Sequence, residues 1–125
     1  LGGDSNKGSY VRHANAPLLS RNEIEFYRDI IFPNPSKGEF RSGLVLQSKD
    51  FENLPNTIVF SAEFDPLSDE GGEYCKKIRK AGGRSKWYLE LGLVHGYLRA
   101  RHSSKKARAS FVRIKDSILE LIEDR

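Results

Sequence analysis

The chain has 125 residues, of which 38% are apolar, and this size bounds it to one domain (1–125) with a modest core. Its mean hydropathy is −0.58, and no apolar run is long enough to cross a bilayer, so we expect a soluble protein with no membrane partner. The formal net charge is only +4, and the basic excess is concentrated in residues 99–108.

The numbers of cysteine and methionine residues indicate the cellular compartment and the start of the chain. The single cysteine, Cys75, excludes an internal disulfide and fits a reducing compartment, which predicts a cytoplasmic protein. Methionine is absent, and Leu1 stands at the first position. Because a complete reading frame normally starts with methionine, we expect the chain to begin inside a longer protein.

The N-terminal third predicts a loop, a helix and a second loop. Residues 1–20 are rich in Gly, Asn, Ser and Pro, which favours extended loop. Ser20 and Glu23 have the spacing of a capping box, and apolar residues recur at helical intervals over 24–31, so a helix is expected there. Prolines in residues 33–43 then end that helix and favour loop.

The middle of the chain predicts a strand, a helix and a second strand. Residues 57–64 form an apolar, β-branched run that is typical of a strand buried on both faces. The helix should begin near Ser68 and end before Gly82, with a buried stripe of Tyr74, Ile78 and Ala81. Residues 84–92 form the second strand. A βαβ unit of this length predicts parallel strands with a right-handed crossover.

The C-terminal part predicts a loop over 93–104 and a last helix over 105–123. The apolar residues of that helix fall on one expected buried face: Phe111, Ile114, Ile118, Leu121 and Ile122. Two parallel strands do not make a stable doubly wound sheet, because parallel sheets need both faces and both edges covered. The pattern therefore indicates an incomplete portion of a larger α/β domain, and the open strand edges predict self-association of the isolated chain.

The basic stretch 99–108 carries most of the excess charge. Such a cluster can bind phosphate groups, but no aromatic side chains interleave with the charges, as they do in single-strand-binding proteins. We therefore expect a solvated approach to the last helix and no nucleic-acid partner. The alternative is a non-catalytic remnant or polyanion-binding module that uses this stretch.

Two residues at the ends of the predicted strands are candidates for catalysis. Asp65 directly follows the first strand and His95 follows the second, and functional groups of open α/β sheets gather at the carboxyl ends of strands. A carboxylate that accepts a hydrogen bond from an imidazole fixes its tautomer and stabilises its cation. Asp65 is also a good turn residue before Pro66, and His95 before Gly96 could be an ordinary loop histidine.

Two segments resemble the hormone-sensitive-lipase-like carboxylesterases, a branch of the α/β-hydrolase fold. The family's D-P-L-x-D-E-G segment reads DPLSDEG at 65–71, and its G-x-x-H-G-F segment reads GLVHGY at 92–97, with Tyr97 where phenylalanine is usual. The segment GSYVRHANAPLLS (8–20) is also similar to the family. The resemblance covers nearly the whole chain and implies the C-terminal portion of an α/β-hydrolase fold.

The resemblance also implies an activity and its residues. A carboxylesterase of this kind cleaves small acyl esters through a Ser-Asp-His triad, with no metal or organic cofactor. Carried over to this chain, Asp65 is the triad acid and His95 is the triad base. The other acids of the segment, Asp69 and Glu70, are expected at the surface, where they favour the dipole at the helix N-terminus.

No serine in the chain has the sequence context of the nucleophile. The pattern G-x-S-x-G needs a strand before it and a helix after it, but Ser5 has four residues before it, and Lys7 stands where glycine is required. No other serine has glycine both two residues before it and two residues after it, and no H-G-G-G-like stretch could form an oxyanion hole. We therefore expect both parts upstream of Leu1 and predict that the 125-residue chain alone is inactive. The three histidines and one cysteine have no spacing typical of a metal site.

Overall fold

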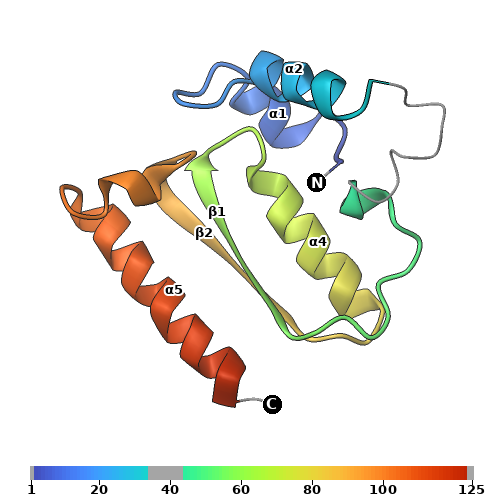
Figure 1. Cartoon of the computed structure of the whole chain (residues 1–125), viewed down its shortest axis with the longest axis vertical. Coiled ribbons are helices and arrows are strands. Elements are labelled where there is room, and N and C mark those ends of the chain that lie inside the picture. Colours follow the sequence, from blue (N-terminus) through green and yellow to red (C-terminus); the bar gives the residue numbers. More distant parts are fainter. Residues whose placement is uncertain (1, 34–43, 124–125) are drawn as a thin grey trace.

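In the part of the chain that the structure describes, helices pack around a two-stranded parallel sheet. The computed structural model describes residues 2–33 and 44–123, so the loop predicted over 33–43 lies outside the described residues except for Pro33. Strand β1 (Thr57–Phe64) pairs with β2 (Ser85–Val94). Figure 1 shows the short helix α1 (Gly8–Arg12) and helix α2 (Arg21–Ile31) lying beyond the carboxyl end of β1.

The predicted strand–helix–strand unit is present, with its strands parallel. Helix α4 (Ser68–Lys80) connects them and packs on one face of the sheet. Within α4, Ile78 and Cys75 are fully buried and Tyr74 is half-buried, as is Ala81 at the end of the helix. At Gly71 the helix comes so close to the sheet that a Cβ atom would overlap Ser61 Oγ and lie 2.9 Å from Val59 Cγ1. Glycine is therefore what lets α4 lie flat on the strands.

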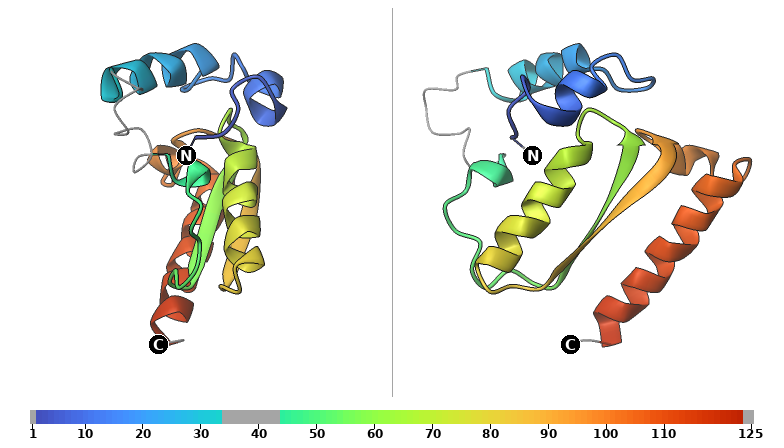
Figure 2. Two further views of the ribbon diagram at one scale, coloured as in Figure 1. Left: turned by 90° about the vertical axis from the view of Figure 1, so that its right-hand side faces the viewer. Right: turned by 180° about the vertical axis from the view of Figure 1, so that it is seen from behind.

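Helix α5 (Lys105–Glu123) covers the other face of the sheet, as the two views of Figure 2 show together with Figure 1. Ala107 packs against Ala62 and Leu93, and Arg113 and Lys86 form ion pairs between the helix and β2, with Glu90 and Glu120 as their partners. A four-residue 3₁₀ helix, η3 (Tyr97–Ala100), lies between β2 and α5 within the region expected to be loop.

The expected burial of α5 is wrong. Its buried residues are small, namely Ala107, Ser110 and Ser117. Phe111, Ile118 and Ile122 are 37%, 52% and 58% exposed, while Ile114 and Leu121 are half-buried. The physical reason is the width of the sheet, since two strands lie under only part of a nineteen-residue helix.

The expectation that β1 is buried on both faces is only partly met. Ser61 and Ala62 are buried, but the residues before them are half-buried. The rings of Phe60 and Tyr88 stack on each other across the strands at 5.0 Å between centroids. Leu91, on β2, is 65% exposed. In the described part of the chain, each strand has one neighbour, so each leaves one edge unpaired.

The N-terminal elements were predicted in part. Helix α2 begins as expected, because Ser20 Oγ accepts a hydrogen bond from Glu23 N, and Ser20 N donates to Glu23 Oε2 at 2.7 Å. Helix α1 lies within the region expected to be loop. No described helix is both long and apolar enough to span a bilayer.

Candidate active site

The structure places Asp65 and His95 in direct contact. Asp65 is the residue after β1, His95 is the residue after β2, and His95 Nδ1 lies 2.8 Å from Asp65 Oδ2. Asp65 is 6% exposed, whereas the His95 side chain is 43% exposed. Because an ionised carboxylate can only accept, Nδ1 carries the proton in this pair and Nε2 remains an acceptor. The arrangement is that of an oriented general base.

The turn after β1 holds the Asp65 carboxylate in this direction. Asp65 Oδ1 accepts a hydrogen bond from Leu67 N at 2.8 Å, and the Asp65 carbonyl accepts one from Ser68 N at 3.0 Å. Asp65 is therefore a turn residue and also the partner of His95. One carboxylate oxygen closes the turn, which leaves the other for the imidazole.

Helix α1 locks the same turn from the other side. Ser9 is 1% exposed, and its hydroxyl donates to the Pro66 carbonyl at 2.6 Å while accepting from Asp69 N at 3.1 Å. The Asp69 carboxylate accepts from Ser9 N at 2.9 Å and forms an ion pair with Arg12. Asp69 lies at the surface in the first turn of α4, as expected, and it also joins two elements sixty residues apart.

Glu70, in contrast to Asp69, departs from the expected surface position. It is 3% exposed, and its Oε1 accepts hydrogen bonds from Tyr10 Oη at 2.9 Å and from Gly3 N at 2.7 Å. Burial, and then the negative charge of Glu70, raise the pKa of Tyr10 above its ordinary value of 10.0. The only sequence signal for Ser9 and Tyr10 was the family-like segment that contains them.

The turn after His95 is tied to helix α5. The hydroxyl groups of Tyr97 and Ser110 lie 2.7 Å apart and share a hydrogen bond. Burial is the main cause that raises the pKa of Tyr97 above its ordinary value. Tyr97 stands where the family usually has phenylalanine, and its hydroxyl group has a hydrogen-bond partner in Ser110.

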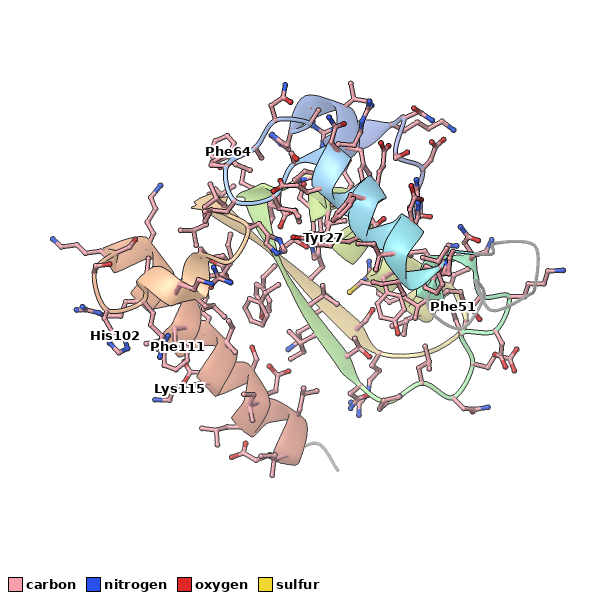
Figure 3. All side chains as sticks on the ribbon, turned by 45° about the horizontal axis from the view of Figure 1, so that its top comes forward. Tyr27, Phe51, Phe64, His102, Phe111 and Lys115 are labelled. Carbon is pink, nitrogen blue, oxygen red and sulfur yellow. The ribbon has the colours of Figure 1, made fainter. Side chains whose placement is uncertain are left out.

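A cavity of about 520 Å³ adjoins His95. Figure 3 shows Tyr27 on α2, toward the strand ends, and this residue forms part of the cavity wall. Its other lining residues are mostly apolar and come from α2 and the segments beside it: Leu19, Ile24, Ile31, Phe32, Leu44 and Leu67, with Tyr10 and Arg28. A second, smaller cavity of about 270 Å³ lies beside β1, and both Asp65 and His95 line it.

The comparison with protein families decides the classification. Residues 2–99 match the model of a family described as having the alpha/beta hydrolase fold. This chain belongs to the α/β-hydrolase family. The carboxylesterase branch that the two motifs resemble is also supported, because several of the relatives are esterases.

The relatives of this α/β-hydrolase family member are much longer than the part that matches. An arylesterase of Saccharolobus solfataricus is 34% identical over 89 residues, which is 71% of this chain and 25% of the relative. Carboxylesterase NlhH of Mycobacterium tuberculosis is 29% identical over 93 residues, or 72% of this chain and 29% of the relative. The chain thus spans between a quarter and a third of the curated relatives' length.

Solved structures confirm the fold. A fungal esterase from Rhizomucor miehei superposes with a TM-score of 0.87 at 22% identity, over 98% of this chain and 38% of that chain. A hyperthermophilic esterase from Pyrobaculum calidifontis gives 0.82 at 24% identity, over 91% of this chain and 38% of that chain. At these identities the likeness establishes the fold.

Ser5 is not in the setting of a nucleophile in this member of the α/β-hydrolase family. It lies in a turn closed by a hydrogen bond from Lys7 N to the Asp4 carbonyl at 3.1 Å, and the next element is the five-residue helix α1. The described part of the chain also holds no group of three or more residues arranged to bind a metal ion.

The basic stretch 99–108 is partly engaged in local structure. Arg108 donates to the carbonyls of Arg101 and His102, and the Arg101 guanidinium lies 5.6 Å from the centre of the Phe111 ring. Arg99, Lys105 and Lys106 are exposed. Two of the charges therefore hold the turn that leads into α5.

Proposed function

We propose that this chain carries the acid and the base of a serine carboxylesterase. The observation that carries the proposal is the 2.8 Å contact between His95 Nδ1 and Asp65 Oδ2 at the carboxyl ends of adjacent parallel strands. The membership of the α/β-hydrolase family and the esterases among the relatives support the same reaction class. Asp65 would orient His95, and His95 Nε2 would move the proton.

The proposed reaction has two halves. A serine supplied by polypeptide outside this sequence attacks the ester carbonyl while His95 takes its proton, and His95 then gives that proton to the departing alcohol. In the second half His95 takes a proton from the water that attacks the acyl-enzyme, and it gives that proton to the serine oxygen as the carboxylic acid leaves. Asp65 stays ionised throughout and stabilises the imidazolium formed in each half.

The substrate class follows from the cavity beside His95. Its wall is mainly aliphatic and aromatic, which favours the apolar part of a small acyl ester. The proposal needs no metal or organic cofactor, since general base, nucleophile and oxyanion donors suffice for acyl transfer. We further propose a cytoplasmic enzyme whose partner is this small substrate rather than a membrane or a nucleic acid.

The test compares the 125-residue chain with the whole polypeptide that its gene encodes. The coding sequence upstream of Leu1 should continue in frame and contain G-x-S-x-G after a glycine-rich segment. The whole polypeptide should hydrolyse p-nitrophenyl butyrate, whereas the 125-residue chain should show negligible turnover, because nucleophile and oxyanion donors supply much of the rate. Substantial turnover by the 125-residue chain that is lost on His95→Ala would refute the proposal that the nucleophilic serine lies outside this chain.

A second candidate is a polyanion-binding module that uses the exposed cations Arg99, Lys105 and Lys106. It predicts binding of a short DNA duplex that weakens steeply between low and moderate salt. A titration at two salt concentrations decides it, and absence of binding at low salt would end this candidate.

A further inference from the structure

The register of the sheet changes shortly before the two candidate catalytic residues. Ala62 pairs with Glu90, as the regular register of the preceding pairs requires, but the next recorded pair is Phe64 with Val94. Residues 91–93 of β2 therefore lie opposite a single residue of β1. This is a bulge on β2 with two extra residues, a device often found beside active sites.

Glu63 is the residue of β1 that faces this bulge. Its Oε2 accepts a hydrogen bond from Gly92 N at 2.6 Å. Gly92 has φ of +73°, a left-handed conformation that glycine adopts at little cost. The bulge is thus held by a carboxylate on one strand and made possible by a glycine on the other.

The bulge decides which residue of β2 reaches Asp65. Phe64 pairs with Val94, so Asp65 and His95, the residues that follow, come level with each other. In the unbulged register, Asp65 would be level with Leu93, and His95 would lie two residues farther along, or about 7 Å at the rise of a strand. The 2.8 Å contact between Asp65 and His95 therefore depends on the two extra residues.

We propose that Glu63 is a positioning residue, which sets the contact between His95 and Asp65 by fixing the bulge at Gly92. The importance of this positioning for catalysis rests on the proposed function, whereas the geometry of the bulge is independent of it. Glu63 acts on the backbone of β2, whereas Asp65 acts on the imidazole itself. A Gln side chain keeps an acceptor oxygen at the same reach, while Asp is one methylene shorter.

The test reads the tautomer of His95 directly by ¹⁵N NMR of histidine-labelled protein, in the whole polypeptide that the gene encodes. Wild type and Glu63→Gln should hold the neutral ring in the Nδ1–H form. Glu63→Asp and Glu63→Ala should lose that preference and populate the Nε2–H form that dominates for a free histidine side chain in water. Glu52→Ala, which removes an exposed loop carboxylate, is the matched control and should match wild type.

The bulge can also be perturbed from the other strand. Gly92→Ala puts a Cβ on a residue with positive φ and against Lys106 Nζ, so it should shift the same signal without touching Glu63. In an active enzyme, kcat should fall about 100-fold for Glu63→Ala, the cost of a misplacement of about 1 Å, and Glu63→Gln should restore it.

The outcomes separate this inference from the proposed function. Retention of the Nδ1–H form in folded Glu63→Ala or Glu63→Asp would overturn the role of Glu63 and leave the acid–base pair intact. If Glu63→Ala does not fold, an unchanged tautomer in Gly92→Ala would overturn it equally. Absence of the Nδ1–H form in wild type would instead contradict the Asp65–His95 pair and with it the proposed function.

Discussion

Asp65 serves two structural purposes with its two carboxylate oxygens, and this division explains why so small a turn can orient a base. Oδ1 accepts from Leu67 N and Oδ2 contacts His95. The sequence predicted that the two side chains would share one edge of the sheet, because each follows a strand. It did not predict the burial of Glu70 or the contact of Glu63 with Gly92, since such pairs join distant residues through contacts that no local pattern reports.

The hydroxyl of Tyr10 gives a pH-dependent prediction. Because the folded pKa of Tyr10 is raised, the unfolded chain loses this proton first, and the contribution of Tyr10 to stability is fully present below pH 10.0 and lost as the pH rises above it. Tyr10→Phe should cost about 1–3 kcal/mol at neutral pH, because buried Glu70 loses a donor. Urea denaturation across pH 7–11 measures both effects.

The free energy of unfolding of Tyr10→Phe should also depend less on pH above pH 10 than that of wild type. Tyr27→Phe, which alters a tyrosine that is 53% exposed, is the control and should leave the curve as in wild type. A Tyr10→Phe protein that loses stability above pH 10 as steeply as wild type would show that Tyr10 is not the group responsible.

At the scale of elements, local signals were reliable where a single segment determines its own structure. The capping box at Ser20 and Glu23 predicted the start of α2, and the apolar run at 57–64 predicted β1. Helix α1 escaped prediction because it is five residues long and is held by tertiary contacts, above all those of Ser9 with the turn at 66–69.

The close packing of α4 on the sheet predicts a large effect at Gly71. A Cβ there overlaps Ser61 Oγ and approaches Val59 Cγ1 to 2.9 Å, so Gly71→Ala should destabilise the fold by about 1–3 kcal/mol despite the better helix propensity of alanine. Lys76→Ala, on the exposed side of the same helix, should change stability by less than about 0.5 kcal/mol. Thermal unfolding of the two variants compares them, and a stable Gly71→Ala protein would contradict the packing.

At the scale of the whole molecule, the fold class followed from the alternation of strands and helices, whereas the burial of α5 did not. A periodic apolar stripe predicts which residues share a face, but not whether anything covers that face. Phe111, Ile118 and Ile122 share such a stripe and remain largely exposed over a two-stranded sheet.

These exposed residues and the unpaired strand edges predict that the isolated chain self-associates. Sedimentation equilibrium should give a mass above the 14.2 kDa of the monomer, rising with concentration. Ile118→Lys together with Ile122→Lys should shift the distribution toward the monomer, whereas Lys115→Arg on the same helix should not. A strictly monomeric wild-type chain would contradict this prediction.

The most direct test of the central claim is the kcat/KM of the whole gene-encoded polypeptide for p-nitrophenyl butyrate. Asp65→Asn and His95→Ala should each lower it by up to about 10⁴-fold, mainly through kcat, because each removes the oriented base. His102→Ala, which removes an exposed histidine of the basic stretch, should leave it unchanged. An active enzyme in which His95→Ala costs less than about tenfold would contradict the assignment of His95 as the base.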